Sequence, residues 1–289
     1  MSVKTIDEPI ATFTQMEWLD YRQLPLESGG FSELFFDYLY EFKEVERFYS
    51  YNFREAQAFH DLMAAIDKRC LNRATLVKVL EDQNKAFGST AKAFDNIALM
   101  LKPGTYAVVT GQQVGLFGGP LYAVLKTITT IKLSERLKQK FPQSDFVPVF
   151  WIEGEDHDFA EVNHAWVLSA GLNPVRLEAG GGSMGRPVGA VELAEPPADA
   201  LREALRGLPF GHEVAELAAQ AYAPGRTMGE AFADLLKRLL GDFGVLTLDP
   251  LRPEIRRLAA PMLAEAARRA PELVAGLLAR NGELIQAGY

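Results

Sequence analysis

The sequence predicts an α/β fold whose core is a parallel sheet with right-handed crossovers. Two apolar, strand-prone runs, at 106–109 and 146–151, lie on either side of a segment with helical spacing that starts at Pro120. A third apolar run, at 244–248, ends at an Asp-Pro pair and is another candidate for a buried strand. A strand, a helix and another strand in succession indicate parallel pairing with a right-handed connection.

The other expected elements follow from local patterns. The runs at 165–169 and 174–178 could form a strand pair. Pro148 counts against a central position for the strand at 146–151, because proline cannot donate a ladder hydrogen bond. Two helices follow the third apolar run, with Pro253 and Pro271 in their opening turns. Helical spacing also predicts helices over 31–51, 53–70, 73–87, 198–206, 212–222 and 228–240.

Composition changes near Leu168. Up to this residue the chain has eleven lysines and six arginines, and after it one lysine, Lys237, and twelve arginines. The shift indicates either a domain boundary or a sequence joined from two sources, and both remain open. We expect four parts: a mainly helical segment that packs on the core at 1–100, the first part of the core at 101–168, an inserted loop and helical segment at 169–240, and a return to the core at 241–289.

Bulk composition is that of a soluble globular protein, with 48% hydrophobic and 24% charged residues. The formal net charge of -8 argues against a nucleic-acid-binding surface over the whole protein. The single cysteine, Cys70, excludes an intramolecular disulfide and suits a reducing compartment. No apolar stretch reaches membrane-spanning length. We therefore expect a cytoplasmic protein without a nucleic-acid or membrane partner.

The stretch TGQQVGLFGGPLY, at 110–122, runs from the first predicted strand into a helix. Ligands bind at this edge of open α/β sheets, and amides at a helix start favour phosphate or carboxylate. The spacing matches neither a Walker loop nor the dinucleotide fingerprint. A tight structural connection would also explain the glycines, although two adjacent glutamines favour a polar ligand. The candidate binding residues are Thr110, Gly111, Gln112, Gln113, Gly115, Gly118, Gly119 and Pro120.

The stretch WIEGEDHDFAEVNH, at 151–164, follows the second predicted strand and allows three interpretations. His157 could be a general acid or base, because nearby carboxylates favour its imidazolium form. Asp156, His157, Asp158 and His164 could hold a divalent metal, although their spacing matches no established motif. The stretch could also be an acidic loop that starts a helix. We take His157, Asp156 and Asp158 as candidate catalytic residues, Trp151, Glu155, Asn163 and His164 as candidate binding residues, and no residue as a metal ligand.

These two blocks carry a resemblance to a known family. TGQQVGLFGGPLYAVLK and VPVFWIEGEDHDFAEVNH resemble the BshC family, the cysteine ligase of bacillithiol biosynthesis, and FFDYLYEFKEVERFYSYNF and the segment from FGVLTLDP to AGY are similar to it in style. The resemblance implies a Rossmann-like core, similar to nucleotidyltransferases and class I aminoacyl-tRNA synthetases. Family members are longer and form homodimers through a coiled coil, so we expect this chain to be an N-terminal portion that ends before the coiled coil.

The resemblance also implies a reaction, in which cysteine is joined to the amine of glucosaminyl malate through an amide bond. We expect ATP or ADP as a cofactor, because this condensation is unfavourable in water without coupling. The loop at 110–122 would receive nucleotide phosphates or the malate carboxylates, and His157 would accept a proton from the amine or orient the activated cysteine. Two other functions stay open: a non-catalytic nucleotide- or sugar-binding module, and a metal-dependent hydrolase.

Overall fold

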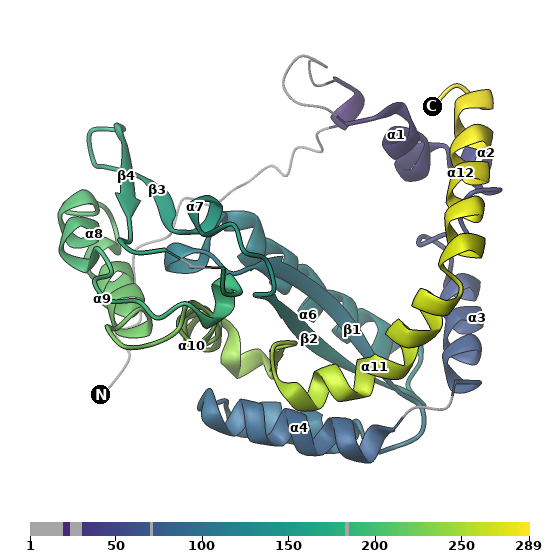
Figure 1. Ribbon diagram of the computed structural model, residues 1–289, viewed down its shortest axis with the longest axis horizontal. Helices are drawn as coiled ribbons and strands as arrows, with labels where there is room; N and C mark the ends of the chain where they lie inside the picture. The colour runs from purple at the N-terminus through teal and green to yellow at the C-terminus, as the bar shows by residue number, and fades with distance from the viewer. Residues whose placement is uncertain (1–19, 24–30, 70–71, 183–184) are drawn as a thin grey trace. The chain divides into compact units, whose positions relative to one another are not determined.

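The computed structural model describes residues 20–23, 31–69, 72–182 and 185–289. Cys70 lies outside the described residues. The chain divides into two compact units, of which unit 1 comprises residues 1–64 and 269–289 and unit 2 comprises residues 65–268. Figure 1 shows the helices and strands of both units. Within the described ranges, no helix is both long enough and apolar enough to span a bilayer.

Unit 2 is built around a parallel sheet of three strands (Figure 1). Strand β1 (Thr105–Gln113) pairs with β2 (Asp145–Glu153), which in turn pairs with β5 (Leu246–Leu248). Helix α6 (Leu121–Lys140) connects β1 to β2. These elements confirm the predicted α/β class and the predicted parallel pairing.

Most of the remaining helices and strands of unit 2 were predicted, but the sequence patterns did not predict α5 (Ala91–Leu99). The strand pair predicted at 165–169 and 174–178 forms between His164–Leu168 and Pro174–Glu178, and it is antiparallel. In chain order these elements are α4 (Arg73–Ala86), α5 (Ala91–Leu99), α7 (Phe159–Val162), β3 (His164–Leu168), β4 (Pro174–Glu178), α8 (Ala198–Ala204), α9 (Gly211–Ala221), α10 (Met228–Leu240) and α11 (Pro253–Arg268), with short 3₁₀ turns η3 (Leu116–Gly118), η4 (Val188–Ala190) and η5 (Gly241–Phe243).

Strand β2 is the central strand of the sheet, and the expectation drawn from Pro148 is wrong on this point. Pro148 pairs with Val108 of β1. Strand β5 pairs with β2 only from Val149 to Trp151, which begins one residue after the proline. The missing N–H of Pro148 therefore does not interrupt the β2–β5 ladder.

Helices cover both faces of the sheet. On one face, Val147, Val149 and Leu246 are buried against residues of α4, α5 and α11. On the other face, Phe150 packs with residues of α6 and α10, and its ring centroid lies 5.6 Å from that of Phe232. Burial on both faces is typical of parallel sheets and explains why the strands read as continuous apolar runs.

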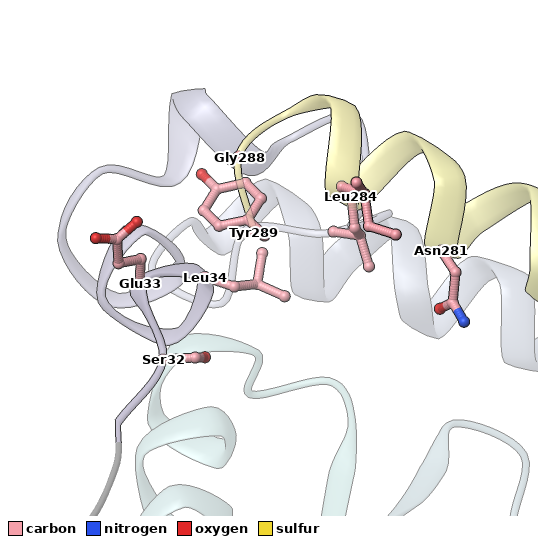
Figure 2. Close-up of a pocket in the computed structure, with 8 residues that line it drawn as sticks. Ser32, Glu33, Leu34, Asn281, Leu284, Gly288 and Tyr289 are labelled. Atoms are coloured by element: carbon pink, nitrogen blue, oxygen red, sulfur yellow. The ribbon is translucent and has the colours of Figure 1, made fainter.

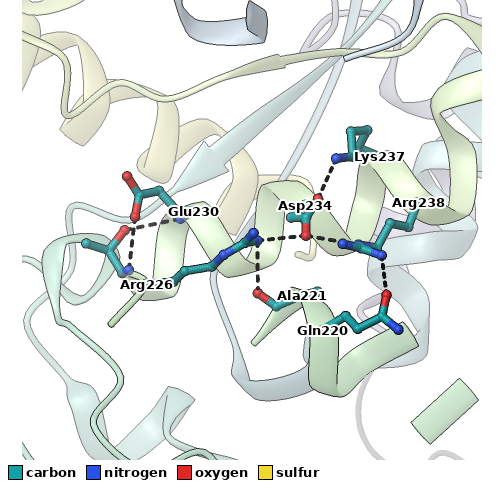
Figure 3. Close-up of polar contacts among 8 residues, drawn as sticks. Gln220, Ala221, Arg226, Glu230, Asp234, Lys237 and Arg238 are labelled. Carbon is teal, nitrogen blue, oxygen red and sulfur yellow. Dashed lines mark hydrogen bonds and ion pairs between the residues drawn. The ribbon is translucent and has the colours of Figure 1, made fainter. Parts of the chain in front are cut away.

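Helix α10 carries a buried carboxylate, Asp234, that binds three basic side chains (Figure 3). Its oxygens lie 2.5 Å from Lys237 Nζ, 2.7 Å from an Arg226 nitrogen and 2.9 Å from Arg238 Nε. Burial acts to raise the pKa of Asp234, but hydrogen bonds from the three cations outweigh burial and lower this pKa. Arg238 also donates a hydrogen bond to the Gln220 side-chain oxygen Oε1 at 2.9 Å, which ties α10 to α9.

Unit 1 contains short helices whose aromatic side chains pack on one another. The prediction of a single helix over 31–51 is wrong, because α1 ends at Tyr40 and Glu41 adopts a non-helical backbone conformation. The Tyr38 ring centroid lies 4.6 Å from that of Tyr49 and 5.1 Å from that of Phe53, and these contacts require the chain to fold back. The elements are η1 (Tyr21–Gln23), α1 (Glu33–Tyr40), α2 (Phe42–Val45), most of α3 (Ala56–Asp67) and α12 (Ala270–Gln286).

A pocket of about 380 Å³ lies between α1 and the end of α12 in unit 1 (Figure 2). Ser32, Glu33 and Leu34 contribute to one side, and Tyr289 to the other. The Tyr289 hydroxyl donates a hydrogen bond to the Asp37 carboxylate at 2.5 Å. This bond, together with burial, raises the pKa of Tyr289 to about 12.

Candidate functional site

The two blocks singled out in the sequence meet at the carboxyl edge of the sheet. The ends of β1 and β2 are in register there, with Gln113 opposite Glu153. The Gln113 side-chain N–H donates to the Asp156 carboxylate at 3.0 Å, which links the loop after β1 to the loop after β2. This edge is where open α/β sheets bind their ligands.

A pocket of about 360 Å³ opens at this edge, between the end of β1, the start of α6, α7 and the start of β3. Its polar side chains include Gln112, Gln113, Tyr122, Glu161 and His164. The predicted residues that line it are Gln112, Gln113, Gly115, Gly119, Pro120 and His164. The predicted residues outside its lining are Thr110, Gly111, Gly118, Trp151, Glu155, Asp156, His157, Asp158 and Asn163.

Helix α6 starts at this pocket without a side-chain cap. Pro120 occupies the cap position, and its side chain makes no capping hydrogen bond. Leu121 and Tyr122 line the pocket. Their N–H groups belong to the first turn of the helix, where backbone N–H groups have no hydrogen-bond acceptor within the helix. Such amides, together with the helix dipole, stabilise anionic groups.

Packing accounts for two of the glycines in the loop at 110–122. A Cβ added to Gly111 would lie 2.9 Å from the Trp151 carbonyl oxygen on the neighbouring strand. Gly118 has a φ of +91°, and a Cβ there would lie 2.9 Å from a Leu235 methyl carbon. A structural reason therefore exists for these positions whether or not a ligand binds.

Tyr222 holds this loop from inside the protein, and the sequence did not single it out. The side chain is fully buried at the end of α9. Its hydroxyl donates to the Gly115 carbonyl oxygen at 2.6 Å and accepts the Gly118 N–H at 2.9 Å. Burial raises the pKa of Tyr222, so the hydroxyl keeps its proton. The Gly118 amide is therefore already bonded within the protein.

The acidic loop after β2 uses two carboxylates to bind its own backbone. Asp156 Oδ1 accepts the N–H groups of His157 at 2.6 Å and of Asp158 at 3.2 Å. The amide bonds from Asp158 and His157 lower the pKa of Asp156. Asp158 caps α7 by accepting the Glu161 N–H at 3.2 Å. Both predicted catalytic carboxylates thus shape the loop in which they lie.

The turn η4 holds the same loop from another side. The Val188 N–H donates to the Asp156 carbonyl oxygen at 2.7 Å, and the Gly189 N–H donates to that of Gly154 at 2.9 Å. A Cβ on Gly189 would lie 2.9 Å from the Gly154 Cα, so the two segments approach as closely as glycine allows. The backbone of the acidic loop is therefore fixed by the fold.

Asn163 and His164 follow α7 and have different environments. Asn163 is buried, and its amide donates to Glu178 at 3.3 Å and to the Ala179 carbonyl oxygen at 3.5 Å. His164 lines the pocket, and its Nδ1 lies 3.1 Å from the Ala160 carbonyl oxygen. A carbonyl oxygen only accepts, so Nδ1 carries the proton in that contact and Nε2 of the neutral ring is an acceptor.

The end of β5 adds a carboxylate that the sequence did not single out. Asp249 follows the strand, and its backbone N–H and C=O bond to the Gln83 side chain at 3.1 and 2.9 Å. Burial raises the pKa of Asp249. Nearby, Glu155 forms an ion pair with Arg256 of α11 at 3.1 Å. Only the strand ending at the Asp-Pro pair was recognisable in the sequence.

A metal site is not formed by the acidic loop. Across the part of the chain that the structure describes, no three His, Cys, Asp or Glu side chains group as metal ligands would. Asp158 instead caps α7, and His164 bonds to a backbone carbonyl.

Comparison with known proteins identifies the family. A family model described as the N-terminal Rossmann-like domain of BshC, of bacillithiol biosynthesis, matches residues 19–289. Curated relatives provisionally named as cysteine ligase BshC are 45% identical over 258 residues in Solibacter usitatus and 36% identical over 273 residues in Salinibacter ruber. These matches cover 89% and 93% of this chain but 48% and 50% of the relatives, so the chain spans about half their length. The chain therefore belongs to the BshC family, within its N-terminal Rossmann-like domain.

Proposed function

We propose that this chain supplies the substrate pocket of a ligase that joins cysteine to the amine of glucosaminyl malate, the amide-forming step of bacillithiol biosynthesis. The family and the names of its relatives support the reaction. One observation supports the place: the uncapped start of α6, the glutamine pair and His164 line the same pocket at the carboxyl edge of the sheet.

The malate part of the substrate fits the α6 side of this pocket. Backbone N–H groups at a helix start bind carboxylates, and Leu121 and Tyr122 present such groups. The pocket lining contains no lysine or arginine among the described residues. A triphosphate carries more negative charge than a carboxylate and favours sites with cations, so we place malate carboxylates here rather than the phosphates of ATP.

His164 is the residue that we propose as proton acceptor, in place of His157. During ligation the amine nitrogen forms a bond to the activated carboxyl carbon of cysteine, the activating group leaves with its electron pair, and the amine loses a proton. With Nδ1 bonded to the Ala160 carbonyl oxygen, His164 can take this proton on Nε2. His157 lies outside the pocket lining, although its backbone N–H helps to shape the loop.

The test is product formation by mass spectrometry, from glucosaminyl malate, cysteine and ATP, with a BshC protein of the relatives' length that contains these residues. His164→Ala should lower turnover by about a hundredfold or more. His157→Ala should retain most turnover, and His212→Ala on α9 is the matched control. Omitting ATP tests whether the reaction depends on nucleotide.

A non-catalytic sugar-binding module is the second candidate, and one observation favours it. Trp166 lines the same pocket and is 60% exposed, so its ring offers an apolar face to a sugar. Binding of glucosaminyl malate without product, in the presence and absence of ATP, would establish the module and overturn the ligase proposal.

A further inference from the structure

Two adjacent glutamines at the end of β1 are fixed in opposite orientations. Lys126 Nζ lies 3.0 Å from Gln112 Oε1, and an ammonium group only donates hydrogen bonds, so its partner atom must be the amide oxygen. Gln113 Nε2 lies 3.0 Å from Asp156 Oδ2, and a carboxylate only accepts, so its partner atom must be the amide nitrogen. A cation thus orients one glutamine, and an anion orients the other.

The Gln112 side of the pocket consequently presents hydrogen-bond donors. With its oxygen on Lys126, Gln112 donates an N–H to the Tyr122 hydroxyl oxygen at 3.3 Å. Since this oxygen accepts that bond, its own proton can be donated to a ligand. The amides at the start of α6 add further donors on the same side.

The Gln113 side of the pocket presents acceptors. With its nitrogen on Asp156, Gln113 keeps its amide oxygen for another partner. Glu161 and His164 line the same pocket and contribute a carboxylate and the Nε2 acceptor of a neutral imidazole. Two neighbouring residues of one strand therefore divide the pocket into a donor wall and an acceptor wall.

We infer that this division orients a ligand that carries both carboxylate and amine groups, with the carboxylate on the donor wall at Gln112 and Tyr122 and the amine on the acceptor wall at Gln113 and Glu161. The inference rests on the proposed function, because glucosaminyl malate has two carboxylates at one end and an amine at the other. In this orientation the nucleophilic amine lies on the side of His164.

Lys126 and Asp156 are positioning residues in this arrangement. Neither lines the pocket, and each acts through the glutamine that it orients. Lys126→Met releases the Gln112 amide, so the donor wall is no longer fixed. Asp156→Asn offers an N–H to Gln113, which turns the Gln113 amide so that its nitrogen, rather than its oxygen, becomes available to the ligand.

Calorimetric titration with glucosaminyl malate and with malate alone separates the two walls. Gln112→Glu is isosteric and replaces a donor with a negative charge, so it should weaken the binding of both ligands by about tenfold or more. Lys126→Met should also lower the affinity for both ligands, and Lys126→Arg should restore it. Asp156→Asn should weaken glucosaminyl malate but leave malate unchanged.

Matched controls exist elsewhere in unit 2. Gln220 also accepts a hydrogen bond from a cation, Arg238, but lies outside the pocket, so Gln220→Glu repeats the chemical change without the ligand. Lys132 pairs with Glu135 on the same helix as Lys126, and Lys132→Met is the control for removing that charge. Both control variants should bind the two ligands as the wild type does.

The outcomes distinguish this inference from the ligase proposal. Unchanged malate affinity in Gln112→Glu, equal losses for both ligands in Asp156→Asn, or no binding of either ligand by the wild-type protein would overturn the orientation. Absence of product together with the expected split in affinity would instead overturn ligation and leave the orientation standing. If both proposals hold, Lys126→Met should raise the KM for glucosaminyl malate more than it lowers kcat.

Discussion

The loop after β1 and the loop after β2 meet at one edge of the sheet, yet they are held in different ways. Contacts with the core shape the first loop: Gly118 packs where a side chain would collide, as Gly111 does near the end of β1, and Tyr222 bonds to the loop backbone from inside. The second loop is also held by η4 through two backbone hydrogen bonds, but unlike the first loop it is shaped by its own carboxylates, since Asp156 and Asp158 accept N–H groups within it.

In both loops, residues that the sequence suggested as ligand contacts instead form hydrogen bonds that hold the loop. In the glycine-rich loop, the Gly118 amide that could have received an anion is bonded to Tyr222. In the acidic loop, Asp158 caps α7. We therefore propose ligand contacts for side chains that line the pocket, which include Gln112, Gln113 and His164.

Tyr222→Phe is the largest test of how the first loop is held. The change leaves the buried Gly115 carbonyl and Gly118 N–H without this partner and should lower the free energy of unfolding by about 3 kcal/mol. Urea denaturation measures the effect. Tyr122→Phe removes a hydroxyl from a half-exposed site and is the control. Equal stability of the two variants would show that the loop does not depend on Tyr222.

Gly118→Ala tests the same loop through its backbone. A side chain at a φ of +91°, with its Cβ 2.9 Å from Leu235, should lower the free energy of unfolding by about 2 kcal/mol. A Cβ on Gly180 meets nothing within 4 Å, so Gly180→Ala should change the same quantity by less than about 0.5 kcal/mol. Similar values for both would mean that the first loop relaxes easily.

Much of the fold could be predicted because its signals are local. The runs at 106–109 and 146–151 are apolar over consecutive residues, and the helix after Pro120 repeats at helical spacing. The order of the strands could not be predicted from local signals, because β5 pairs with β2 across a long stretch of chain. The sequence around Pro148 could not show that β5 begins to pair one residue later.

The candidate site divides along the same line. Gln112, Gln113 and His164 belong to short blocks with unusual composition, so they could be found from the sequence alone. Tyr222 lies 104 positions from Gly118, and only the folded chain brings them together. The sequence did not single out Lys126, because its proposed role depends on which atom of Gln112 it contacts.

Asp249→Asn, at the end of β5, should raise the free energy of unfolding, whereas Tyr222→Phe and Gly118→Ala should lower it. Burial raises the pKa of Asp249 above its unfolded value of about 3.9, so any stabilising contribution exists below that pH and is lost as pH rises. The substitution should therefore raise the free energy of unfolding at pH 7 by about 1 kcal/mol, because the amide oxygen can still accept the Leu251 N–H. Asp242→Asn, at an exposed position, is the control, and an equal or lower stability for Asp249→Asn would show that the ionised form is accommodated without cost.

The smallest expected effect is a difference between the two loops in the hydrogen-exchange protection of their backbone amides in acid. Bonds from the Asp158 and His157 amides lower the pKa of Asp156, so its contribution exists above the unfolded value of about 3.9 and is lost as pH falls through the folded value. Hydrogen exchange followed by NMR should show the His157 and Asp158 amides losing protection in acid, and Asp156→Asn should remove that dependence. The Gly118 amide should keep its protection over the same range, because its partner is the Tyr222 hydroxyl, which does not titrate in acid. A simultaneous loss of protection in both loops would mean that they open as one unit, and the division between a loop held by the core and a loop held by its own carboxylates would fail.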